Sequence, residues 1–263
     1  MNPEQAFKAL LRNNSHEKRD SLEQTISEDA NLSYHYAEEV IEGRFELGEE
    51  AISQSAIWSY HYAHDVIKGR WELGEAAISK DAFLAFEYAD DVIDGRFELG
   101  EAAICQFADR SCLYATHIIQ GRWEPGEAAI SKNALWSLCY AMDVIQGRWE
   151  PGEAAISKDA EHSLGYARDV IKRRFKLGEA AISKSEQYAF LYLKQVIREK
   201  WTRKLAMMCP CWLYLYAKDV IRGRLPKAMH NKMISFGIID SENKYVKKYC
   251  GSKKYQVKKK AEF

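Results

Sequence analysis

A 26-residue unit recurs along the chain, and this period constrains the fold more than any other feature. Its clearest copy reads YADDVIDGRFELGEAAI, from Tyr88 to Ile104. The tyrosines that open successive copies are Tyr36, Tyr62, Tyr88, Tyr114, Tyr140, Tyr166 and Tyr192, and Tyr216 opens an eighth copy two residues early. A fixed period of this length is typical of a solenoid, in which each unit buries its apolar face against its neighbours.

Each copy is predicted to contain a long helix, a glycine turn and a short helix. Asp81 is a natural N-cap, and apolar residues from Ala82 to Ile93 recur with helical spacing. We expect Gly95 to adopt the left-handed conformation that ends this helix. Two copies then begin the short helix with Glu-Pro-Gly-Glu, and proline is well tolerated in a first helical turn. The sequence therefore predicts an all-α, right-handed α-solenoid of short helix-turn-helix repeats.

The two ends of the chain depart from the repeat, as terminal capping units of a solenoid must. The predicted parts are an N-terminal cap over 1–22 with a helix from Pro3 to Arg12, about eight repeats over 23–224, C-terminal capping helices over 225–250, and a basic disordered tail over 251–263. Arg173 and Glu199 replace the turn glycine of the sixth and seventh copies. Each replacement should cost on the order of 1 kcal/mol if the backbone there is left-handed.

Composition is that of a folded chain, with 47% hydrophobic and 29% charged residues among 263. No apolar run is long enough to span a membrane, and the first residues lack the layout of a secretion signal, so we expect a cytoplasmic protein without membrane contact. The six cysteines form no paired CxxC framework and are expected to be reduced thiols. Residues 225–263 hold ten lysines and three acidic residues, a net +7 that the preceding residues balance.

The repeated motif YAxDVIxGRWExGEAAI resembles that of an uncharacterised family of short α-repeat proteins from large tailed bacteriophages. The resemblance covers about Glu23 to Arg224, and the closing LPKAMHNKMISFGI is similar to the terminal cap of that family. It implies a phage-encoded protein that acts in the cytoplasm of an infected bacterium. It implies no catalytic residues and no assigned activity.

Differences between copies separate scaffold from surface. Residues that recur from copy to copy, such as the arginine of the GR pair and the opening tyrosine, could form an anion-binding row or a base-stacking platform. The acidic residues that recur beside each arginine, for example Glu101 near Arg96, favour an ion-pair ladder instead. We likewise expect the tyrosines to stack between units.

Four positions of each copy vary, and we call them the variable strip. In the third copy they are Phe83, Glu87, Asp90 and Asp94, whose spacings of 4, 3 and 4 place them on one side of a helix. The strip changes from acidic through apolar to basic along the chain. Its candidate partner-binding residues are Ile57, His61, His64, Phe83, Glu87, Asp90, Leu113, Leu135 and Met142. Its basic residues, candidates for an acidic partner or nucleic acid, are Arg168, Lys172, Lys194, Arg198, Lys218 and Arg222.

The leading hypothesis is a non-catalytic scaffold that binds a host or viral protein through the variable strip. The alternatives are nucleic-acid binding along the basic end and a small-molecule sponge. No phosphate-binding loop, dinucleotide fingerprint or nucleophile elbow is present in the sequence, so we expect neither an enzyme nor a cofactor. His61 and His64, with His35 and Glu87 in adjacent copies, come nearest to a metal site, but ordinary surface histidines explain them and no metal is expected.

Overall fold

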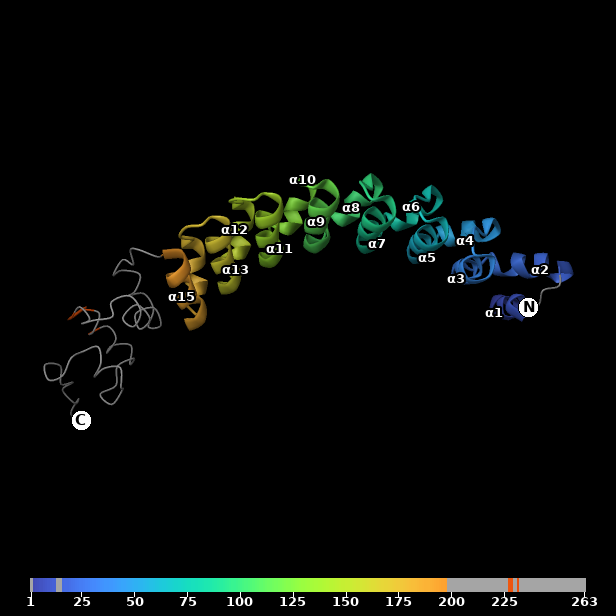
Figure 1. Ribbon diagram of the computed structural model, residues 1–263, viewed down its shortest axis with the longest axis horizontal. Coiled ribbons are helices and arrows are strands. Elements are labelled where there is room, and N and C mark those ends of the chain that lie inside the picture. The colour runs from blue at the N-terminus through green and yellow to red at the C-terminus, as the bar shows by residue number, and fades with distance from the viewer. Residues whose placement is uncertain (1, 13–15, 198–226, 229–230, 232–263) are drawn as a thin grey trace, which may run out of the picture. The chain divides into compact units, whose positions relative to one another are not determined.

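The computed structural model describes residues 2–12, 16–197, 227–228 and 231, and every regular element in these ranges is a helix. The all-α prediction is therefore confirmed for this part of the chain. The chain divides into two compact units, residues 1–145 and 146–263. Within the first unit, the helices of successive copies lie side by side in chain order (Figure 1). No helix in the described ranges is long and apolar enough to cross a membrane.

Each of the seven copies that the structure describes opens with an α-helix that continues directly into a π-helix. In the third copy, α7 (Ala82–Glu87) runs into η4 (Tyr88–Ile93). The other pairs are α3 (Ala30–Tyr36) and η1 (Ala37–Ile41), α5 (Ala56–His61) and η3 (Tyr62–Ile67), α9 (Ala108–Tyr114) and η6 (Ala115–Ile119), α11 (Ala134–Cys139) and η7 (Tyr140–Val144), α13 (Ala160–Gly165) and η8 (Tyr166–Val170), and α15 (Glu186–Tyr192) and η10 (Leu193–Ile197). Asp81 accepts hydrogen bonds from the backbone N–H groups of Phe83 and Leu84, which confirms it as an N-cap.

A short helix follows the turn in each of the six copies whose second half the structure describes. Where tryptophan precedes it, the short helix is α-helical throughout: α6 (Glu72–Ile78), α10 (Glu124–Ile130) and α12 (Glu150–Ile156). Where phenylalanine precedes it, a 3-10 turn comes first: η2 (Glu46–Gly48) and α4 (Glu49–Ser53), η5 (Glu98–Gly100) and α8 (Glu101–Ile104), and η9 (Lys176–Gly178) and α14 (Glu179–Ile182). Pro125 and Pro151 lie in the first helical turn, as predicted. Before the copies come α1, with the predicted bounds Pro3–Arg12, and α2 (His16–Ile26).

The turn that ends each long helix differs from the prediction. The left-handed residue is Asp94, with a φ of 51°, and Gly95 lies outside that region. The N–H of Gly95 donates to the carbonyl of Ala89, six residues earlier, at 3.0 Å. The left-handed residues of the other copies are Glu42, Lys68, Gln120, Gln146 and Lys172. Arg173 follows the left-handed Lys172 and is not itself left-handed, so the strain expected there is absent.

In the described repeats a buried tyrosine hydroxyl joins a copy to the one before it, and we call this arrangement the tyrosine clamp. The Tyr114 hydroxyl donates to Glu101 Oε1 at 3.1 Å and accepts from the backbone N–H of Phe97 at 3.0 Å. Arg96 holds the same carboxylate through two N–H···O bonds of 2.9 and 3.0 Å. The clamp recurs with Tyr62, Tyr88, Tyr140, Tyr166 and Tyr192.

The clamp explains both recurring rows of the sequence. The expected arginine–glutamate ion pairs are present, and in the copies described each lies within one copy. The predicted stacking between units is not seen for Tyr36, Tyr62, Tyr88, Tyr114 and Tyr166. The ring of each packs on the aromatic residue of its own copy, as Tyr114 does on Trp123 with ring centroids 4.9 Å apart. Burial raises the pKa of Tyr114 to about 12, so the hydroxyl stays protonated and remains a donor at neutral pH.

Helix α2, which precedes the first copy, forms a variant of the tyrosine clamp with Tyr36. The Tyr36 hydroxyl donates to Glu23 Oε1 at 2.5 Å, with the same separation of 13 residues as in the repeats. Arg19 occupies the place of the aromatic residue, four positions before the glutamate. Its Nε donates to both Glu23 and the Tyr36 hydroxyl, so one guanidinium replaces the paired arginine and the backbone N–H of a regular clamp.

A second bond between copies comes from a buried serine that the sequence analysis did not single out. Ser59 Oγ donates to the carbonyl of Ile52, at the end of the preceding short helix, at 2.9 Å. The same bond is made by Ser33, Ser111, Ser137 and Ser163.

Gly74 packs so close to Ser59 that an added Cβ would lie 2.7 Å from the serine Cβ. The second glycine of the motif is therefore required by close helix packing.

We predict that Tyr114→Phe lowers the free energy of unfolding by about 1–3 kcal/mol, because it leaves the buried N–H of Phe97 without its hydrogen-bond partner. Urea denaturation followed by circular dichroism would measure the change. Tyr60→Phe is the matched control. Its hydroxyl bonds the exposed Asp91 at 3.2 Å, so its loss should cost no more than about 0.5 kcal/mol. Equal effects of the two substitutions would contradict the structural role of the clamp.

Candidate functional site

The variable strip lies on the α–π helices, and its apolar members reach solvent. Ile57, Phe83, Leu135 and Met142 are exposed by 47%, 44%, 46% and 42%, respectively. Leu113 is half-buried and contributes less surface. Fully buried tyrosines and isoleucines already form the core of the scaffold. The exposed apolar side chains of the strip are therefore not needed to form that core. Their role in binding stays a prediction.

An aromatic cluster forms around Phe83, and only part of it was expected. Phe107, from the next copy, lies beside Phe83 with ring centroids 5.7 Å apart. The guanidinium carbon of Arg110 lies 4.3 Å from the centre of the Phe83 ring and 5.4 Å from that of Phe86. Phe107 and Arg110 were missed because they lie outside the four variable positions. The cluster combines two exposed aromatic rings with an arginine stacked on one of them.

Phe107 also departs from the polar N-cap residue of the other described copies, one of which, Ser55, likewise makes no cap bond. Phe107 occupies the N-cap position of α9, where the other described copies have aspartate, asparagine or serine. Asp29, Asp81, Asn133 and Asp159 each accept a backbone hydrogen bond there, whereas the Phe107 side chain makes no cap bond. An N-cap of this kind stabilises a helix by about 1 kcal/mol. The departure itself was visible in the sequence and could have identified Phe107.

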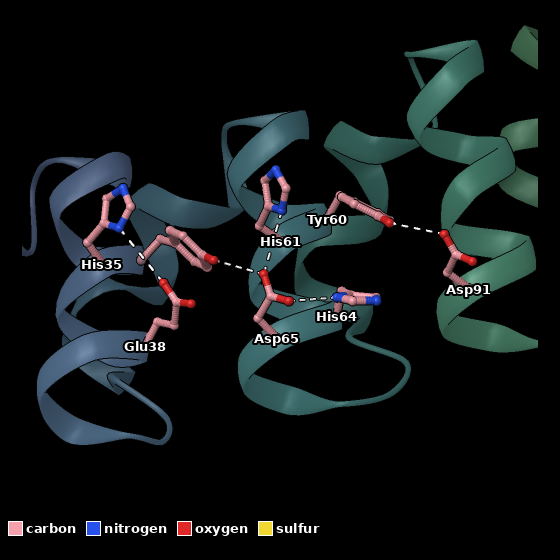
Figure 2. Close-up of polar contacts among 8 residues, drawn as sticks. His35, Glu38, Tyr60, His61, His64, Asp65 and Asp91 are labelled. Atoms are coloured by element: carbon pink, nitrogen blue, oxygen red, sulfur yellow. Dashed lines mark hydrogen bonds and ion pairs between the residues drawn. The ribbon is translucent and has the colours of Figure 1, made fainter.

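The histidines of the strip belong to a polar network over the first three copies (Figure 2). Asp65 is its centre: it accepts from the Tyr34 hydroxyl at 2.8 Å and lies 2.6 Å from His64 Nδ1. His61 Nδ1 is 3.6 Å from the same carboxylate. Burial opposes ionisation of Asp65, but the bonds from His64 and Tyr34 outweigh it and lower the pKa of Asp65. His61 and His64 are therefore already engaged within the protein.

The acidic members of the third copy also have partners. Glu87 Oε1 lies 3.7 Å from Arg110, and Asp90 lies 3.2 Å from His117 Nδ1. Burial raises the pKa of Glu87, with Arg110 acting in the opposite direction. Among the described residues, the group with ligand atoms mutually within 4.8 Å is His35, Glu38 and Glu39, and not the set of His35, His61, His64 and Glu87 considered from the sequence.

The basic end of the strip is only partly described. Arg168 forms two bonds to Asp169 at 2.7 and 2.6 Å and a third to Gln195, so its charge is largely neutralised. Lys172 and Lys194 are exposed. Arg198, Lys218 and Arg222 lie outside the described residues. A shallow hollow in the second unit is lined instead by Arg148, Glu153, Ile171, Arg173, Arg174, Phe175, Lys176 and Leu177.

A second exposed apolar row occupies a recurring position outside the four variable positions. It lies at the start of the short helices, two residues after the aromatic residue of each clamp. Its members are Leu47, Leu73, Leu99 and Leu177, and prolines replace leucine at the exposed positions 125 and 151. Recurrence alone therefore does not indicate burial.

Comparison of the chain with known family models, curated proteins and solved structures found no match.

Proposed function

We propose that this protein is a non-catalytic repeat scaffold that binds a protein partner through the variable strip. In this proposal the repeats form a right-handed α-solenoid of period 26, continuing to about residue 224. The resemblance of the repeated motif to phage proteins suggests a phage-encoded modulator or inhibitor of a host bacterial factor or defence system, acting in the host cytoplasm.

The observation that carries the proposal is the exposed phenylalanine at the N-cap of α9. Phe107 is 46% exposed and replaces a polar cap that other copies use. An exposed ring contributes little to the stability of the fold. A polar cap at the same position would stabilise the helix by about 1 kcal/mol. A residue that breaks a local rule in this way is expected at a functional site.

The composition of the cluster favours a protein partner. Aromatic residues and arginine are enriched among the residues that contribute most to protein–protein binding. Phe83 and Phe107 offer apolar surface, and Arg110 holds a guanidinium over the Phe83 ring. Ile57, Leu135 and Met142 extend exposed apolar surface to the copies on either side. Such a row is expected to mark an interaction surface.

Nucleic-acid binding is the second candidate, and the hollow of the second unit favours it. Arg148 and Arg174 are paired with Glu153 and Glu179. Arg173 and Lys176 are exposed, and neither forms an ion pair with another described residue. These two cations could contact phosphate groups.

We predict that Phe83→Ser and Phe107→Asp each abolish capture of the partner from infected bacterial cells, measured by affinity purification and mass spectrometry. Phe107→Asp should also raise the free energy of unfolding by up to about 1 kcal/mol, because it supplies the missing cap. Leu73→Ser, which removes an exposed leucine from the other apolar row, is the control and should leave capture intact. Unchanged capture by both folded variants would rule out this surface.

For the second candidate, fluorescence anisotropy with a short DNA duplex across a salt series is the test. Arg173→Ala combined with Lys176→Ala should weaken binding and reduce the slope of log affinity against log salt by about 2, since two phosphate contacts are lost. Lys158→Ala with Lys184→Ala removes two other exposed lysines as the control. No binding at low salt, or an unchanged slope, would reject the candidate.

A further inference from the structure

The imidazole of His35 and two carboxylates converge at the end of α3. His35 lies in the last turn of α3, and Glu38 and Glu39 lie in the first turn of η1. His35 Nδ1 is 3.1 Å from Glu39 Oε1 and 3.9 Å from Glu38 Oε2. The ligand atoms of the three residues all lie within 4.8 Å of one another. One nitrogen and two carboxylate oxygens are thus presented from a single helical segment.

The imidazole nitrogen lacks a hydrogen bond despite this proximity. His35 Nδ1 is buried and has no hydrogen-bond partner, because Glu39 lies near it but outside hydrogen-bond geometry. Ligands at about 2.0–2.2 Å from a zinc ion are roughly 3 to 3.5 Å from one another. The 3.1 Å separation therefore suits two atoms that share a cation, and the 3.9 Å separation would close by a small rotation of the exposed Glu38.

Aromatic neighbours hold the imidazole in place. The His35 ring lies 5.0 Å from the ring of Tyr34 and 5.6 Å from that of Trp58, measured between centroids. These contacts restrict the rotation of His35, while Glu38 and Glu39 remain open to solvent. A cation could therefore enter from solvent and meet a nitrogen that is already oriented.

The equivalent positions of the next copy provide a contrast. There His61, His64 and Asp65 replace His35, Glu38 and Glu39. Asp65 already accepts from the Tyr34 hydroxyl and lies 2.6 Å from His64 Nδ1 (Figure 2). The Asp65 carboxylate therefore already has its hydrogen-bond partners within the protein. The second set has no unpartnered group comparable to the His35 nitrogen.

We propose that His35, Glu38 and Glu39 bind a divalent transition-metal ion of the zinc, cobalt or nickel type. Imidazole suits these ions, whereas magnesium and calcium prefer sites built from oxygen alone. Three protein ligands leave positions for water, and no other residue is required to complete the site. His35 and Glu38 occupy strip positions of the first copy, two copies before Phe83, so the site shares no residue with the cluster around Phe83 and Phe107.

Isothermal titration of the full chain, freed of metal by chelation, with ZnCl₂ tests the site. Wild type should show a component of one zinc per chain that His35→Ala and Glu39→Gln each weaken at least about tenfold, since even indirect supports of metal ligands contribute 10–100-fold. Glu39 is exposed, so Glu39→Gln keeps the fold and remains informative if His35→Ala unfolds.

The double variant His61→Ala/His64→Ala is the matched control and should retain this component. Magnesium should not compete for it at equal concentration. The proposal is overturned if wild type lacks the component, if Glu39→Gln leaves it unchanged, or if only the His61→Ala/His64→Ala variant loses it.

Discussion

Burial of a glutamate carboxylate at four of the described junctions between copies is the constraint on which the described structure depends. Glu49, Glu75, Glu153 and Glu179 are more than nine-tenths buried, and a buried carboxylate is unfavourable unless it is paired and hydrogen-bonded. The tyrosine clamp meets this requirement from both sides: an arginine of the same copy neutralises the charge, and the tyrosine of the next copy donates a further bond. A copy without its successor would leave the carboxylate and a backbone N–H incompletely satisfied.

This dependence explains why the copies can vary on their surface without losing their architecture. The clamp, the buried serine and the closely packed glycine all use recurring positions and lie between or beneath the helices. The left-handed residue of each turn accepts glutamate, lysine, aspartate or glutamine, so even this strained position is variable. Charge and apolar surface can therefore change from copy to copy, which is the property the proposed binding function uses.

Periodicity was sufficient to predict the helices, because helical spacing and N-cap residues are local signals. Asp81 and α1 match their predictions for that reason. The position of the left-handed residue could not be predicted from glycine content, since the six-residue hydrogen bond places Asp94 and not Gly95 in that conformation. The clamp also needed the structure, because Phe97 and Tyr114 are 17 residues apart and meet only after folding. At the candidate site, Ile57 and Phe83 are exposed as the strip requires, whereas the contribution of Phe107 depends on a contact between copies.

Hydrogen exchange at the backbone amide of Phe97, resolved by NMR, tests the clamp most directly. This amide lies before the short helix, where no helical hydrogen bond protects it, so the Tyr114 hydroxyl is its partner in the structure. With the clamp in place, exchange at this amide should be as slow as at amides inside the neighbouring helices, and it should become fast in Tyr114→Phe. Exchange in the wild type at the rate of a solvent-exposed turn would contradict this expectation.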